Sequence, residues 1–161
     1  MITVPAILFY DVVVALHVMT VVIAFGVTFV YPAIIPWFVK AHPEAMPAVH
    51  EMQVRVGRLI ITPFATLALL TGIYLAADRD LFSEAWVTIP MVILIVLLGL
   101  GGAFFTPREK QLAALARRDL DAGGGLSDEY AARARTVGMV GALSSALILI
   151  AIFCMVARPF A

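Results

Sequence analysis

Two histidines and a methionine recur at steps of four in the stretch AHPEAMPAVHEM, residues 41–52. His42, Met46 and His50 supply two imidazoles and a thioether, a combination that suits copper and particularly Cu(I). A continuous helix would place all three on one face, but Pro43 and Pro47 interrupt that helix and make the alignment partial. We weigh a copper site against a solvated loop whose Met side chains dip into lipid, and against a partner contact.

A third histidine, His17, lies in a run without any charged residue. Polar side chains deep in a membrane are costly and indicate function by default. His17 is therefore a candidate ligand of haem b or copper, a proton-relay group, or a donor of a hydrogen bond across a helix bundle. By rise along a helix, His50 lies before the second span and cannot share one haem iron with His17 within a monomer. A haem would need a second subunit, or a Met such as Met91 or Met139.

Charge distribution identifies the elements that carry these residues. The 161 residues are 63% hydrophobic with a mean hydropathy of +1.03, well above ordinary soluble domains. Charge-free gaps, each about the ~20 residues that cross a bilayer, predict four membrane helices. We place these spans at about 8–31, 57–77, 86–106 and 136–157, in a single integral membrane domain covering 1–161. The fold class is all-α, a four-transmembrane-helix bundle.

The Lys and Arg residues predict how this bundle is oriented. Nine of the eleven fall in the first and third loops. By the positive-inside rule, these two loops are cytoplasmic and both termini are outside, in a bacterial cytoplasmic (inner) membrane. In the third loop, Gly123–Gly125 ends one helix and Ser127 caps the next, while Thr106–Glu109 has the form of a capping box. Helices three and four should therefore extend into the cytoplasm. The prolines of the first loop should keep it from forming a continuous helix.

Small and hydroxylated residues form stripes along the predicted spans. Membrane helices approach one another through such stripes. The residues that we expect at helix contacts are Thr20, Ala24, Thr28, Thr62, Thr66, Gly99, Gly102, Gly138, Ala142 and Ser145.

Enzyme fingerprints are not found in the sequence. HEMQV, from His50, has Val54 where a zinc-binding HExxH has its second histidine, and there is no Walker loop, CxxC, GxSxG or dinucleotide motif. Zero net charge gives no indication of nucleic acid as a partner, and Cys154 alone makes no intrachain disulfide. Asp11, the one acid inside a predicted span and near its outer end, suits either a helix start or a small transporter.

Four segments carry a resemblance that spans nearly the whole chain. They are LHVMTVVIAFGVTF, ITPFATLALLTGIYLA, FFTPREKQLAAL and the ending CMVARPF. They resemble a family of bacterial four-helix predicted integral membrane proteins, in which the last span similarly closes with Met-Val and then a basic-Pro tail. The family is distantly similar to membrane components of copper-resistance systems. That similarity implies a metal-ligand role for His17 alone.

We expect a non-enzymatic small membrane protein that works by contact. It would be an accessory or stabilising subunit of a larger inner-membrane complex, a transporter or respiratory assembly, with lipid and other membrane subunits as partners. The alternative is a haem- or copper-binding membrane protein that uses His17 or the His42, Met46 and His50 cluster.

Overall fold

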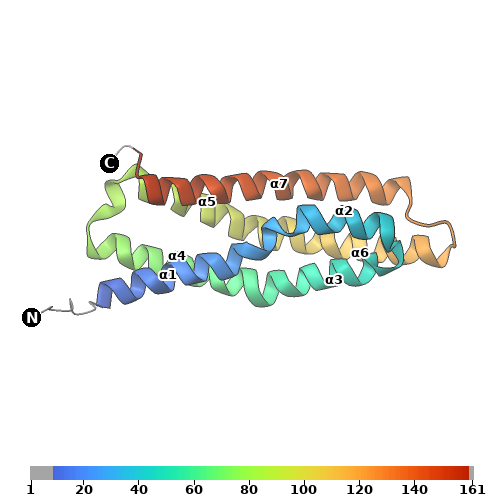
Figure 1. Ribbon diagram of the computed structural model, residues 1–161, viewed down its shortest axis with the longest axis horizontal. Coiled ribbons are helices and arrows are strands. Elements are labelled where there is room, and N and C mark those ends of the chain that lie inside the picture. Colours follow the sequence, from blue (N-terminus) through green and yellow to red (C-terminus); the bar gives the residue numbers. More distant parts are fainter. Residues whose placement is uncertain (1–8, 160–161) are drawn as a thin grey trace, which may run out of the picture.

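The computed structural model describes residues 9–159, and 91% of these residues are helical. Four helical segments are long and apolar enough to cross a membrane: Phe9–Ala41, Pro43–Asp78, Ala85–Asp121 and Asp128–Ala157. They lie lengthwise beside one another in an elongated bundle (Figure 1). Within the described part no strand occurs, so the predicted all-α bundle of four spans is confirmed.

Each segment is longer than a bilayer requires. The segments have 33, 36, 37 and 30 residues, against the ~20 that cross the hydrocarbon core. The start of the first segment, the end of the last segment and the connection between the second and third lie at one end of the bundle. The other two turns lie at the opposite end (Figure 1). The latter end carries most of the charged residues and extends beyond the apolar portion. We predicted this extension for the last two helices, and the first two segments share it. Which side of the membrane it occupies stays a prediction.

The first segment consists of α1 (Phe9–Phe25), a 3-10 turn (Gly26–Phe29) and α2 (Tyr31–Ala41). The expectation of a broken chain at YPAIIPWFVK was wrong, because α2 runs through it. Pro32 lies in the first turn, where its missing N–H costs nothing, so Pro36 is the one proline that removes a donor from the helix interior. The break comes at His42, followed by the 3-10 turn Pro43–Ala45.

The second and third segments each contain a π-helical turn. One, Gly57–Ile61, joins α3 (Met46–Val56) to α4 (Thr62–Asp78), and the other, Gly101–Phe105, joins α5 (Ala85–Leu100) to α6 (Thr106–Asp121). A Thr-Pro pair follows both turns. The N–H of Thr62 bonds to Gly57 O, and that of Thr106 to Gly101 O, five residues back. A turn that takes in one extra residue rotates the following helix face by about 100°.

One of these turns corrects the expectation about Thr106. Thr106 does not begin a capping box, because α5 continues into α6 and its hydroxyl donates to Gly101 O at 2.9 Å. Pro63, the second residue of α4, directly follows the other π turn, and that turn accommodates its missing donor. The turns also set how α3 and α6 face each other in the charged end of the bundle.

The turn between α6 and α7 (Asp128–Ala157) follows its predicted chemistry. Gly123 and Gly125 adopt positive φ of 73° and 75°, and the Ser127 hydroxyl caps α7 by accepting from Tyr130 N at 3.2 Å. The Asp119 carboxylate accepts from Ser127 N at 2.9 Å. Hydrogen bonds from the Ser127 side chain and N–H lower the pKa of Asp119. Ser83 would suit a cap of the third span by its sequence position, but α5 follows Glu84 and no side chain caps it.

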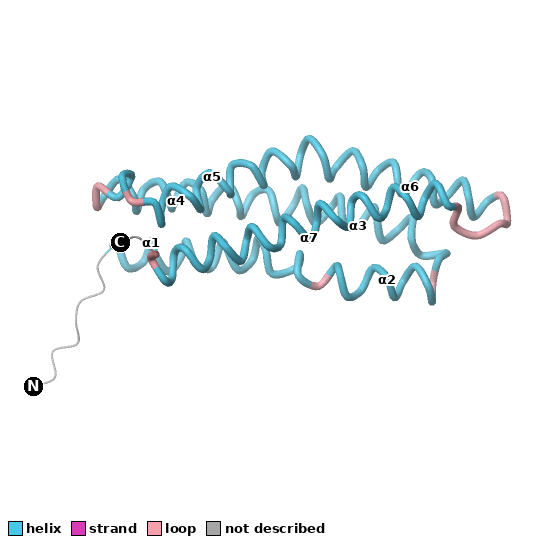
Figure 2. Tube along the Cα trace, turned by 90° about the horizontal axis from the view of Figure 1, so that it is seen from above, coloured by secondary structure: helices cyan, strands magenta, loops and turns pink. Residues whose placement is uncertain are grey.

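Loops are confined mainly to the two ends of the bundle (Figure 2). The most extensive helix pairs are α1 with α4, α3 with α6, and α5 with α7. Buried apolar residues form two clusters. One cluster in the membrane half contains Ala24, Phe25, Ala65 and Ile148. The other, in the charged half, contains Met46, Val49, Leu112, Leu115, Ala116, Tyr130 and Val137.

Candidate functional site

His17 joins α1 to α4 inside the membrane half. Its Nδ1 lies 3.0 Å from Thr71 Oγ1, and the Thr71 hydroxyl donates its single proton to backbone carbonyls of α4, with Leu67 O at 2.8 Å. The Thr71 oxygen must therefore accept from His17, which places the ring proton on Nδ1. Gly72 makes the approach feasible, since a Cβ there would lie 3.1 Å from His17 Cε1. This is the cross-bundle hydrogen bond that was one interpretation of His17.

The other side of His17 lines a small apolar cavity of about 60 Å³. Phe25, Pro90, Leu94 and Met155 are among its other lining residues. With the ring proton on Nδ1, Nε2 is the nitrogen that keeps a lone pair. A cavity of this size is too small for haem, since pockets for drug-sized ligands have about 300–1,000 Å³. The donor types of His17 and Met155, imidazole and thioether, do suit Cu(I). Met139, a partner suggested by the sequence, is instead 59% exposed.

His50 is the centre of a buried polar triad in the charged half. Its Nδ1 lies 2.5 Å from Glu109 Oε2 on α6, and its Nε2 lies 2.8 Å from the Tyr130 hydroxyl on α7. The three residues are only 2–5% exposed. Since the Glu109 carboxylate accepts, Nδ1–H donates to it, and Tyr130 either donates to a neutral ring or accepts from an imidazolium. The hydrogen bonds of the triad are thus compatible with a neutral His50 ring and with an imidazolium.

The surroundings of the triad are apolar. Met46 and Leu112 are almost fully buried beside it. Burial raises the pKa of Tyr130, and the nearby Glu109 carboxylate raises it further, so the phenol keeps its proton. His50 is therefore a ring with both nitrogens hydrogen-bonded. A metal ligand role would require breaking one of these bonds.

Glu109 and Tyr130 were missed by sequence reasoning. The signal for Glu109 was present, because Leu112, Ala113 and Ala116 follow it at helical steps of three and four. An acid on the apolar stripe of a helix is buried when the helix packs. For Tyr130, nothing in the sequence distinguishes a buried hydroxyl from an interfacial aromatic.

The structure separates the histidine and methionine stretch into two environments. Met46 and His50 lie one helical turn apart on α3, and both are buried. His42 lies at the end of α2, with its side chain 48% exposed and its Nδ1 3.2 Å from Glu44 Oε1. Among residues 9–159 no group of three or more His, Cys, Asp or Glu side chains is placed to hold a metal ion. Asp11 lies in the first turn of α1, as a helix-start role expects.

The small-residue positions divide into buried and exposed groups. Thr20 and Ala24 are buried at the contact of α1 with the bundle, while Thr28 and Ser145 are half-buried. The remaining positions of the predicted stripes are exposed on the surface of this chain: Thr62, Thr66, Gly99, Gly102, Gly138 and Ala142. In α4, Ala65 and Ala68 are buried in place of the two threonines.

Comparison with known proteins assigns the chain to a protein family. The model of a family described as predicted integral membrane protein (DUF2269) matches residues 11–159. No curated protein and no solved structure matches the chain.

Proposed function

Because the chain belongs to the DUF2269 family of predicted integral membrane proteins, we propose that it works inside the membrane by contact. It acts as a non-enzymatic accessory or stabilising subunit of a larger inner-membrane assembly, a transporter or respiratory complex. The occupant of its contact face is a transmembrane helix of a partner subunit.

The observation that carries this proposal is the set of open glycines on α5, α7 and the π turn after α5. A Cβ added at Gly99, Gly102 or Gly138 would meet no atom of the chain within 4 Å. Gly72, by contrast, is in contact with His17. Glycines in membrane helices let another backbone approach closely, and here the chain's own helices do not use that approach.

The exposed glycines on the two helices lie at one level along the bundle. Phe104 and Phe105, which follow Gly102, pack against the cluster that contains Val137, the neighbour of Gly138. Of the residues of α5, Val87 and Pro90 are the buried ones. A partner helix would therefore find room on α5 and α7 without displacing the chain's own packing.

The test uses the open space at these glycines, where an added Cβ meets no atom of the chain within 4 Å. Gly102→Leu and Gly138→Leu should leave helicity and thermal stability in detergent unchanged but abolish co-purification of the partner from native membranes. Matched controls are Ile89→Phe and Leu143→Phe, which add bulk at exposed apolar positions of the same helices. At about 100° per residue, Leu143 points about 140° away from Gly138.

Three results would contradict the proposal. The protein could purify alone from native membranes, the glycine variants could retain the partner, or cross-linking could give only homo-oligomers. The last result would replace a partner subunit by a second copy of the chain.

A second candidate function is supported by the cavity that His17 shares with Met155. A Cu(I) ion bound to Nε2 of His17 and the Met155 sulfur would make the chain a copper-handling membrane protein. Purified protein loaded with Cu(I) should retain copper through dialysis. His17→Ala and Met155→Leu should lose it, and Met139→Leu, an exposed methionine outside the cavity, should not. Equal retention by all variants would exclude this site.

A further inference from the structure

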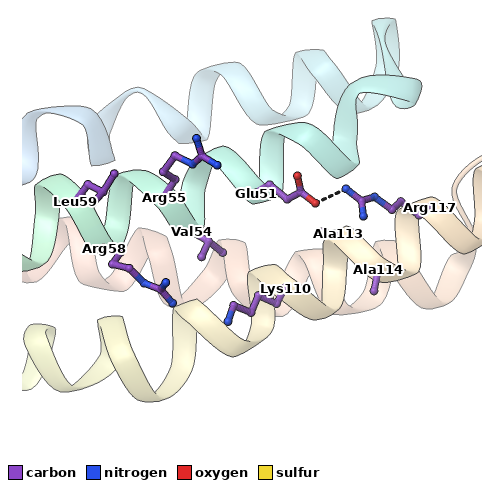
Figure 3. A pocket seen from close by; sticks show the side chains of 9 residues that line it. All are labelled: Glu51, Val54, Arg55, Arg58, Leu59, Lys110, Ala113, Ala114 and Arg117. Carbon is purple, nitrogen blue, oxygen red and sulfur yellow. Dashed lines mark hydrogen bonds and ion pairs between the residues drawn. The ribbon is translucent and has the colours of Figure 1, made fainter.

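A groove opens between α3, the π turn that follows it, and α6. Its volume is about 510 Å³. Figure 3 shows the side chains that line it. The polar ones are Glu51, Arg55, Arg58, Lys110 and Arg117, and the apolar ones are Val54, Leu59, Ala113 and Ala114.

The charges of this groove do not balance. Four cationic side chains face one carboxylate, and Glu51 is bonded to Arg117. The i,i+4 spacing of Glu51 and Arg55 on α3 would also allow a pair, but the structure pairs Glu51 with Arg117. In the described part of the chain no ion pair engages Arg58 or Lys110. Their side chains come from different helices and point toward one another (Figure 3). Two like charges that converge repel, and an anion between them would remove that cost.

The groove lies where the apolar part of the bundle ends. Arg58 immediately precedes the charge-free stretch Leu59–Ala77, and Lys110 follows the charge-free stretch Ala85–Pro107 by three residues. The two cations therefore lie at the level of lipid head groups. Leu59, beside Arg58, is 63% exposed and continues the groove toward the lipid-facing surface of α4.

We propose that this groove binds the phosphate of an anionic phospholipid. Arg58 and Lys110 hold the phosphate from two helices, and one acyl chain runs from the groove along Leu59. The apolar wall favours a membrane lipid over a soluble phosphate, because a free anion makes no use of Val54, Leu59 and Ala114. Basic pockets at the ends of membrane helices recognise head groups in this way.

The experiment measures lipid binding to the full chain purified in mild detergent. Native mass spectrometry with added phosphatidylglycerol or phosphatidylcholine gives the bound lipid. Wild type should retain phosphatidylglycerol preferentially, and Arg58→Gln/Lys110→Gln should bind it about thirtyfold more weakly, from the usual contribution of two cations near an anionic head group. The matched control is Lys40→Gln/Arg135→Gln, which removes the same charge from exposed positions of α2 and α7 outside the groove and should bind as wild type does.

The unfolding temperature in detergent provides a second measurement of the same groove. In neutral detergent, Arg58→Gln/Lys110→Gln should unfold at the same or a higher temperature than wild type, because the repulsion is gone. Added phosphatidylglycerol should then raise the unfolding temperature of wild type and of the control, but not of the groove variant. Equal lipid responses of the groove and control variants would overturn the site. Equal stabilisation by inorganic phosphate would overturn the lipid and assign the groove to a soluble anion.

Discussion

Replacing His50 by leucine should strongly destabilise the charged half of the bundle. Leucine roughly conserves volume, so the change removes the polar contacts with little cavity cost. It leaves the Glu109 carboxyl group buried, 5% exposed, and without its histidine partner, and it removes the partner of the Tyr130 hydroxyl. Breaking one side of a buried pair costs about 3–5 kcal/mol, a large part of the 5–15 kcal/mol that stabilises a typical domain.

The chain contains its own control for this prediction. His42 also bonds to a glutamate, Glu44, at 3.2 Å, but both side chains are exposed, at 48% and 69%. An exposed pair contributes about 0–1 kcal/mol, so His42→Leu should change stability little. The two substitutions are chemically identical and differ in burial and in the second partner, Tyr130.

The assay is reversible unfolding in mixed detergent, followed by circular dichroism. A double variant, His50→Leu/Glu109→Leu, should recover most of the loss, because no unpaired carboxyl group is then buried. Two results would refute the reasoning. One is a His50→Leu effect no larger than that of His42→Leu. The other is a double variant whose loss equals the sum of the single losses.

Four further outcomes follow from the same structure and can be measured in the same detergent system. Ser127→Ala removes the side-chain cap of α7 and should cost about 1 kcal/mol by chemical unfolding, whereas Ser83→Ala, at a position that caps nothing, should have no effect. Gly123→Ala, at a φ of 73°, should cost about 1 kcal/mol, and Gly124→Ala, where φ is not positive, should cost less. Gly72→Val places its Cβ 3.1 Å from the His17 ring and should lower the unfolding temperature. The matched control is Gly26→Val, whose Cβ meets nothing within 4 Å and should cause no such clash. Hydrogen bonds from Ser127 lower the pKa of Asp119, so above pH 3.8, the ordinary pKa of an aspartate, wild type should be more stable than Asp119→Asn. This advantage should be lost as the pH falls further. A stability difference that does not depend on pH would contradict this linkage.

The turn between α6 and α7 could be predicted because its residues act locally. Gly123, Gly125 and Ser127 act through the conformation and hydrogen bonds of a few neighbouring residues, which the local sequence already specifies. Prolines were harder to interpret. The helices nevertheless continue through Pro36, Pro63 and Pro107. A π turn directly precedes the Thr-Pro pairs of Pro63 and Pro107 and accommodates their missing donors, whereas Pro36 removes one donor from the interior of α2.

The sequence by itself determined the four membrane spans and the division of the chain into an apolar half and a charged half. Both properties are sums over local hydropathy and charge, and a bilayer leaves a short apolar segment no alternative to a helix. Only the tertiary structure decided that His50 meets Glu109 and Tyr130, while His42 stays exposed with Glu44. The partners of His50 are 59 and 80 residues away along the chain. Their meeting depends on the rotation that π turns impose on α3 and α6, and local sequence patterns do not carry that information. The convergence of Arg58 with Lys110 has the same origin, since the two cations belong to different helices.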